Sequence, residues 1–88
     1  MTIKYDSVTH DILCFAKMIK RPFLAKEPMY VFARMDRLSK VERSIAMLIE
    51  RGYLKDCGDG LAQITSSGID HVYLLARQYG KSLAHKED

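Results

Sequence analysis

Four side chains that donate hydrogen bonds lie within seven residues of one another near the middle of the chain. Arg37, Lys40 and Arg43 carry positive charge, and Ser39 adds a hydroxyl group. Guanidinium and ammonium groups bind anionic oxygen atoms, and arginine can also meet a planar pair of acceptors with two parallel hydrogen bonds. This group of donors predicts contact with a partner that presents negative charge and hydrogen-bond acceptors. Ser44 is a weaker candidate for the same role.

The positive charge of the chain is concentrated around these side chains. The 88 residues carry a formal charge of +3. Residues 20–56 hold nine lysines or arginines against five acids, whereas residues 1–19 are neutral and residues 57–88 sum to −1. A surface that meets a polyanion requires such an excess, although a solvated basic face gives the same pattern. Three further cations are candidates for contacts that only position the domain: Lys26, Arg34 and Lys55.

The donors need a rigid element to hold them, and residues 37–51 have the pattern of a helix. Three apolar residues of this segment repeat with the 3.6-residue period of a buried stripe: Val41, Ile45 and Leu48. The residues that point away from that stripe are Ser39, Lys40, Glu42, Arg43, Ser44, Ala46 and Met47. One helix would therefore bury one side and offer the other to a partner.

The ends of this helix also have recognisable signals. Ser39 and Glu42 fit the S-x-x-E capping box, and Asp36 is a competing cap that would start the helix earlier. Gly52 is placed to end the helix in the left-handed conformation. Ser39 therefore has a second interpretation as a cap alone, and Arg43 a second one as the partner of a neighbouring surface acid.

The rest of the sequence predicts one small α+β domain over residues 1–88, mostly helical with a small β-hairpin. Gly58, Asp59 and Gly60 form a turn triplet, and Pro22 ends the first helix. The expected segments are a helix over residues 6–19 that Asp6 or Ser7 caps, an extended segment or edge strand at residues 23–24, a short helix over residues 28–35, the hairpin over residues 53–65, a last helix over residues 66–84 and a flexible tail over residues 84–88.

The last helix has a broader apolar surface than the packing of one small domain normally uses. We therefore expect it to join two copies of the chain, and the alternative is that it only covers the core. The residues expected at the dimer interface are Val72, Leu75, Ala76, Tyr79 and Leu83.

Two stretches carry a resemblance to a known class of proteins. The first, VERSIAMLIERGYL, is similar to the end of the recognition helix, the glycine and the first wing strand of small bacterial regulators. These regulators belong to the multiple-antibiotic-resistance, arsenical-resistance and phenolic-acid families (the MarR, ArsR and PadR types). The second, ITSSG, resembles the segment that opens the last helix of these regulators. The resemblance covers about residues 8–80. It implies a winged helix-turn-helix fold in the order helix, short strand, helix, helix, strand, strand, helix.

The resemblance and the donors together predict a sequence-specific protein that binds double-stranded DNA and regulates transcription, as a repressor and a homodimer. A helix fits the major groove, where each base pair presents its own pattern of donors and acceptors, so residues 37–51 are expected there. The hairpin over residues 53–65 would lie beside the backbone, where Asp59 at its tip is unfavourable. The alternative is a winged helix that binds another protein without DNA, which the acids Asp36 and Glu42 beside the donors favour.

Other functions lack the residues they need. His10, His71 and His85 are isolated, and Cys14 and Cys57 have no metal-ligand spacing, so we expect no metal, no cofactor and no enzymatic activity. The two cysteines are expected as free thiols, which suits a cytoplasmic protein. No run of residues has the length and apolar character of a membrane span, and the N-terminal residues lack the order of a signal peptide.

Overall fold

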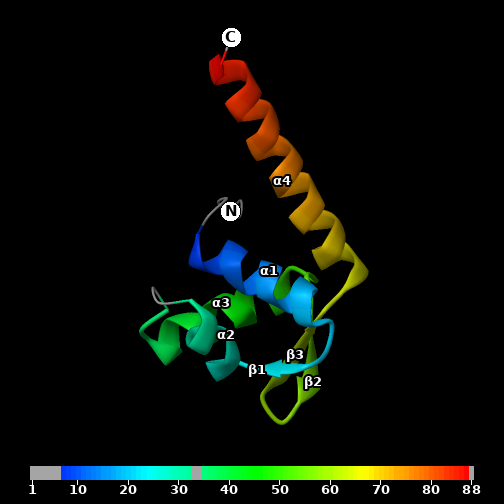
Figure 1. Ribbon diagram of the computed structural model, residues 1–88. Coiled ribbons are helices and arrows are strands. Elements are labelled where there is room, and N and C mark those ends of the chain that lie inside the picture. Colours follow the sequence, from blue (N-terminus) through cyan, green and yellow to red (C-terminus); the bar gives the residue numbers. More distant parts are fainter. Residues whose placement is uncertain (1–6, 33–34, 88) are drawn as a thin grey trace.

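The computed structural model describes residues 7–32 and 35–87, and side chains up to residue 79. The elements of this part of the chain are α1 (Val8–Ile19), β1 (Phe23–Leu24), α2 (Lys26–Val31), α3 (Leu38–Glu50), β2 (Leu54–Gly58), β3 (Leu61–Ile64) and α4 (Ser66–Glu87). These residues form four helices and one three-stranded antiparallel sheet, so the expected α+β class and the expected order of elements are confirmed (Figure 1).

Helix α1 ends at Ile19, where the sequence predicts, and it begins at Val8, after one of the two expected caps. Ser7 is the N-cap, and its side chain accepts a hydrogen bond from the backbone N–H of His10 at 3.1 Å. This bond satisfies one of the donors that the first turn leaves without a helical partner. Lys20 closes the other end in the left-handed conformation, with φ of 53°, and its N–H bonds to the carbonyl of Ala16.

The sheet has β3 in its centre, between β1 and β2. Strand β1 is the expected short edge strand, and Phe23 pairs with Ala62. Strands β2 and β3 form the expected hairpin, in which Leu54 pairs with Ile64. The turn needs positive φ angles at three successive residues, which Gly58, Asp59 and Gly60 adopt at 84°, 55° and 78°. Glycine and aspartate tolerate this region best, so the turn triplet has the residues that its geometry demands.

Helix α2 corrects the prediction of a helix over residues 28–35. It begins two residues earlier, at Lys26, because Glu27 is held in place by two contacts. The Glu27 carboxylate accepts a hydrogen bond from the N–H of Leu24 at 2.7 Å, and it forms an ion pair with Arg21 at 2.7 Å. These contacts fix the turn that enters the helix. It ends at Val31, because the backbone of Phe32 is extended.

Helix α3 has the predicted end but not the predicted cap. Its N-cap is Arg37, and no side chain caps it, so both the capping box at Ser39 and the competing cap at Asp36 are wrong. At the other end Gly52 takes a φ of 82° and donates to the carbonyl of Ile49, as the sequence predicts.

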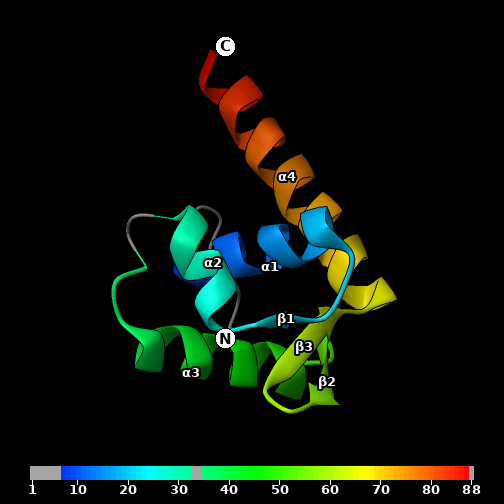
Figure 2. The same cartoon turned by 60° about the horizontal axis from the view of Figure 1, so that its bottom comes forward.

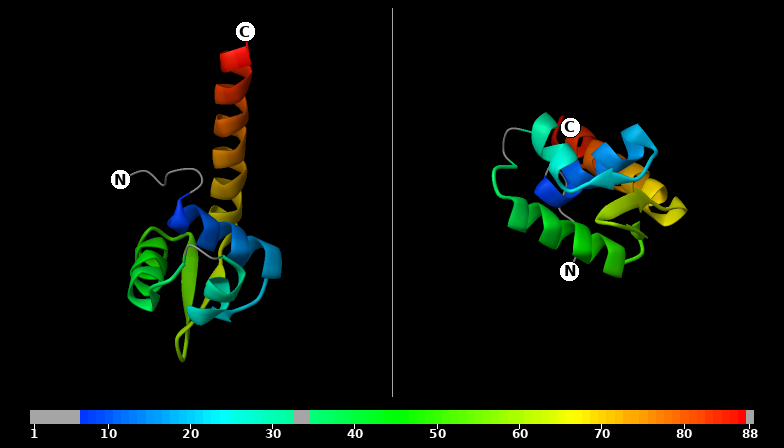
Figure 3. Two further views of the ribbon diagram at one scale, coloured as in Figure 1. Left: turned by 60° about the vertical axis from the view of Figure 1, so that its left-hand side comes forward. Right: turned by 90° about the horizontal axis from the view of Figure 1, so that it is seen from below.

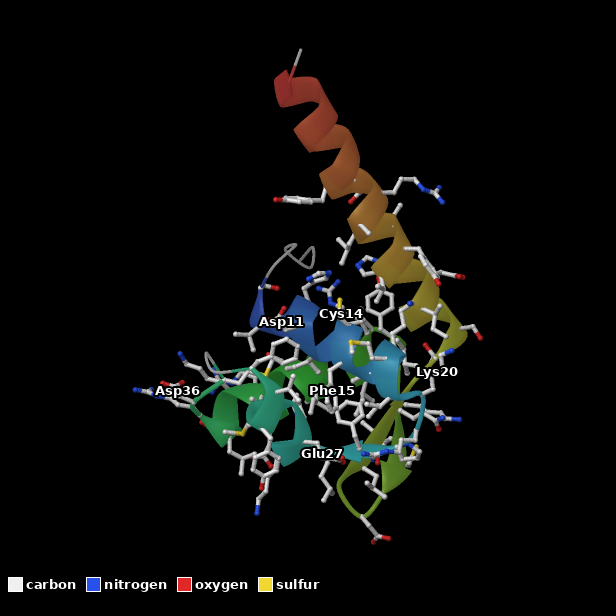
Figure 4. All side chains as sticks on the ribbon, in the orientation of Figure 1. Asp11, Cys14, Phe15, Lys20, Glu27 and Asp36 are labelled. Carbon is white, nitrogen blue, oxygen red and sulfur yellow. The ribbon has the colours of Figure 1, made fainter. Side chains whose placement is uncertain are left out.

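The core lies between α1, α3, the sheet and the first turns of α4 (Figure 1). Phe15 of α1 points down to the sheet in Figure 4, where its ring meets the edge of Phe23 at 5.3 Å between centroids. The largest fully buried side chains come from four elements and the start of α2: Phe23, Ile12, Leu13, Leu48, Leu54, Val41 and Pro28.

Thr65 and Gly68 attach α4 to the end of α3. The Thr65 hydroxyl lies 2.6 Å from the carbonyl oxygen of Gly52 and accepts the N–H of Gly68 at 3.1 Å. Gly68 is buried, and a Cβ atom there would overlap the carbonyl of Tyr53. From this junction α4 projects far from the rest of the chain, on the side away from the hairpin (Figures 1 and 3). It continues to Glu87, beyond the expected end near residue 84.

No helix among the described residues has both the length and the apolar character that crossing a membrane requires.

Candidate nucleic-acid interface

The predicted donors lie on the exposed side of α3, in its N-terminal half. Val41, Ile45 and Leu48 are buried, which confirms the predicted stripe. Figure 2 shows α3 along the outside of the molecule, with its N-terminal end far from the hairpin. The predicted donors that the structure exposes there are Arg37, Ser39, Lys40 and Arg43, and the acids Asp36 and Glu42 are exposed beside them.

A hollow of about 270 Å³ lies between this end of α3 and the start of α1. Apolar side chains of Val8, Met35 and Val41 contribute to its lining, and three cations line it with them: Arg37, Lys40 and Arg43. Asp36 also borders the hollow, and Figure 4 shows this acid extending outwards at the same end of the molecule. The cations therefore surround one recess and are not dispersed over the surface.

Ser44 is less available than the other donors. It is half-buried, and its hydroxyl accepts a hydrogen bond from Thr9 of α1 at 3.3 Å. This side chain joins two helices, so its place in the structure favours a role in packing over contact with a partner.

The outlying cations are separated from this group. Lys26 is exposed in the first turn of α2, and Lys55 is exposed on β2, which follows the opposite end of α3. Arg34 lies outside the described residues. The positive charge is therefore concentrated at the N-terminal half of α3. Any contacts from Lys26 and Lys55 would lie at the edges of this surface.

The β2–β3 hairpin has a different charge. Asp56 and Asp59 are both exposed there. The Asp56 carboxylate accepts a hydrogen bond from the N–H of Gly58 at 2.9 Å, which stabilises the irregular end of β2. A second hollow, of about 210 Å³, lies between the hairpin and α3, and its charged lining residues are Glu42 and Asp56. The two sides of α3 therefore present opposite charge.

A cluster at the junction of α1 and α4 was not anticipated from the sequence. The ring of His71 stacks on that of Tyr53, with centroids 4.4 Å apart, and Nε2 of His71 has no hydrogen-bond partner among the described residues. Burial lowers the pKa of His71, and the positive charges of His10 and Arg51 act in the same direction. Cys14 Sγ lies 3.3 Å from Nε2 of His10, a spacing of one helical turn that the sequence does contain.

Burial also raises the pKa of the Cys14 thiol, which keeps it in the neutral form. The side chains of His, Cys, Asp and Glu in the described part of the chain form no group of three or more that could hold a metal ion.

Two of the residues expected at the dimer interface on α4 are buried within their own chain. Val72 and Leu75 are only 9% and 4% exposed, because they pack into the core of their own chain. Ala76 and Tyr79 are exposed. The side chain of Leu83 lies outside the described residues.

None of the family models, curated proteins or solved structures that were compared with the chain matches it. The function must therefore be argued from the charges, exposure and packing of the described residues.

Proposed function

We propose that the protein is a winged-helix regulator that binds double-stranded DNA with sequence specificity and acts as a repressor in the form of a homodimer. The observation that carries this proposal is the exposure of Arg37, Lys40 and Arg43 together on the N-terminal half of α3, whose opposite side is buried. A helix with its side chains has the width of the major groove of B-form DNA.

Each of these donors has a different expected part in the complex. Arg43 is exposed on α3, and a guanidinium group can reach the two acceptors at the edge of a guanine. Arg37 and Lys40 flank it and would bind phosphates, which hold the helix in register without reading the sequence. Repression would follow if the bound protein covers its operator.

The β2–β3 hairpin is the wing in this proposal, and its part in DNA binding is small. Its two exposed acids, Asp56 and Asp59, would lie near phosphates and repel them. Lys55 on β2 is an exposed cation that would partly offset this repulsion. Phosphate contacts supply most of the affinity for nonspecific DNA, so we assign that affinity to α3.

Gel shifts with fragments of the source genome at several salt concentrations test the proposal. The wild-type protein should bind some fragments at low salt, and the variant with Lys40→Glu and Arg43→Glu should bind none of them. A matched control reverses two exposed cations elsewhere, Lys20→Glu and Arg51→Glu, and makes the same change in net charge. The proposal fails if the wild type binds no fragment at low salt, or if both variants lose binding equally.

One observation favours a second function, the binding of another protein. The hollow between α3 and the hairpin combines apolar side chains with Glu42 and Asp56, which suits a basic segment of a protein better than DNA. This function is supported over the first if the wild type captures a protein partner that the Glu42→Lys variant does not bind. The variant with Lys40→Glu and Arg43→Glu should then bind that partner as well as the wild type does.

A further inference from the structure

Four side chains of α4 form a stripe on the side of the helix that faces away from the core. Asp70, Tyr73, Leu74 and Arg77 line one shallow hollow, at the spacings of three, four and seven residues that place side chains on one helical face. Tyr73 is 56% exposed and Leu74 is 45% exposed. Two large apolar groups therefore lie in solvent on a helix that already buries its opposite face.

The order of charges along this stripe is symmetric about its centre. Asp70 lies three residues before Tyr73, and Arg77 lies three residues after Leu74. Seven residues of helix separate the two charges by about 10.5 Å. Neither Asp70 nor Arg77 forms an ion pair with another residue in the described part of the chain.

This symmetry matters when two copies of the helix meet. If the helices run antiparallel, with a two-fold axis between Tyr73 and Leu74, Asp70 faces the partner's Arg77, and the same pair forms again on the other side of the axis. The apolar pair then lies between two ion pairs, as Tyr73 meets the partner's Leu74. A parallel arrangement would instead place two copies of Asp70 side by side, which is repulsive.

Two other features shape the surroundings of the stripe. Lys17 of α1 lies over the ring of Tyr73, with Nζ at 4.7 Å from the centroid, so the ring is held in place before a partner arrives. Helix α4 also projects from the rest of the chain, which gives a second helix room to lie along it (Figure 3).

We propose that two copies of this chain pair through the stripe Asp70, Tyr73, Leu74 and Arg77, with their α4 helices antiparallel and the two-fold axis between Tyr73 and Leu74. This replaces the buried Val72 and Leu75 as interface residues and specifies the dimer that accompanies the proposed function. No residue of the stripe belongs to α3, so the pairing leaves the donors of α3 free for a partner.

Charge reversal tests the pairing and its register in the full chain without any DNA. Sedimentation equilibrium should show a dimer for the wild type. Asp70→Arg alone, or Arg77→Asp alone, should weaken it roughly tenfold or more, because each change turns two attractive contacts into repulsive ones. The double variant Asp70→Arg and Arg77→Asp should recover the wild-type affinity, since both ion pairs form again in reverse.

Mixing the two single variants tests whether these charges lie at the interface between the two copies. Antiparallel pairing predicts that the Asp70→Arg chain and the Arg77→Asp chain form a heterodimer more readily than either forms a homodimer. Circular dichroism checks that every variant is folded, and Gln78→Glu, an exposed change on the same helix outside the stripe, serves as the control with unchanged affinity.

Three results would overturn the inference: a wild-type monomer at high concentration, a dimer that neither single reversal weakens, or a double variant that stays dissociated. Because no DNA is present, loss of the dimer and failure of DNA binding are separate outcomes.

Discussion

The N-terminal half of α3 and the β2–β3 hairpin are both exposed and both adjoin the surface where DNA is proposed to bind, yet they differ in charge and in the use of their polar groups. On α3, three cations are exposed over a buried apolar stripe. On the hairpin, Asp56 and Asp59 are exposed, and Asp56 already accepts a hydrogen bond within its own turn. Exposure alone therefore does not identify a binding surface, because the hairpin residues serve the hairpin's own geometry.

The backbone explains part of this difference. Three successive positive φ angles restrict the tip of the hairpin to residues such as glycine, asparagine and aspartate. None of these is a cation. The outer side of α3 has no such restriction, so its residue types are free to suit a partner.

The largest expected effect comes from removing the guanidinium group of Arg43 from the α3 surface. Arg43→Ala should cost about 1–3 kcal/mol of binding free energy on the preferred DNA sequence, roughly tenfold to a hundredfold in affinity, and less on other sequences. Fluorescence anisotropy with both kinds of duplex measures this. Lys55→Ala, on the hairpin, provides the comparison and should change affinity only slightly. Equal losses for the two variants would remove the distinction between the regions.

A second variant tests whether the hairpin contributes to the stability of the fold or contacts DNA directly. Gly68→Ala should lower the free energy of unfolding by about 1–3 kcal/mol, because the added Cβ overlaps the Tyr53 carbonyl at the base of the hairpin. Urea denaturation measures this loss. Ser67→Ala, at the exposed neighbouring position, is the control. DNA affinity at low temperature should stay close to that of the wild type, and a large drop in a folded variant would assign the hairpin a direct contact.

Acid should weaken the junction of α1, α4 and Tyr53 through His71. Since burial lowers the pKa of His71 in the folded chain, the unfolded chain binds more protons at acid pH, and stability decreases as the pH falls below the unfolded value of about 6.5. Above that pH the contribution is complete. Urea denaturation at a series of pH values should show this decrease, and His71→Phe, which retains an aromatic ring beside Tyr53, should reduce it. A His71→Phe profile that matches the wild type would assign the decrease to other groups.

The smallest expected effect concerns the tip of the hairpin. Asp59→Asn removes a negative charge and keeps a residue that tolerates positive φ, so the turn should persist. If the tip lies near phosphates, the affinity for DNA should rise about twofold at low salt and return to the wild-type value at high salt, where exposed charges are screened. An increase that persists at high salt would contradict this electrostatic explanation.

Local patterns in the sequence predicted much of the fold. The period of Val41, Ile45 and Leu48 identified the buried side of α3, and Gly52 identified its end, because these signals depend on neighbouring residues alone. The turn triplet identified the hairpin for the same reason. The exposure of Lys40 and Arg43 followed directly from the period of the stripe. Arg37 lies four residues before Val41, and it is exposed as the extended N-cap that precedes the helix.

Contacts between distant segments could not be predicted in the same way. Ser44 is bound to Thr9 of another helix, and Val72 and Leu75 are buried because α1 lies against that side of α4. The earlier start of α2 depends on Glu27, whose carboxylate reaches both Arg21 and the backbone of Leu24. In each case the sequence contains the polar or apolar residue but not the position of its partner.

The central place of β3 in the sheet determines how far the chain can be shortened. One of its neighbours, β1, comes from the first third of the sequence, although only two residues of β1 take part. A fragment that starts at α3 would keep the hairpin but leave one edge of β3 without a strand, with Ala62 uncovered beside it. Such bare edges recruit strands from other molecules. The smallest fragment that stays dispersed in solution should therefore retain Phe23 and Leu24.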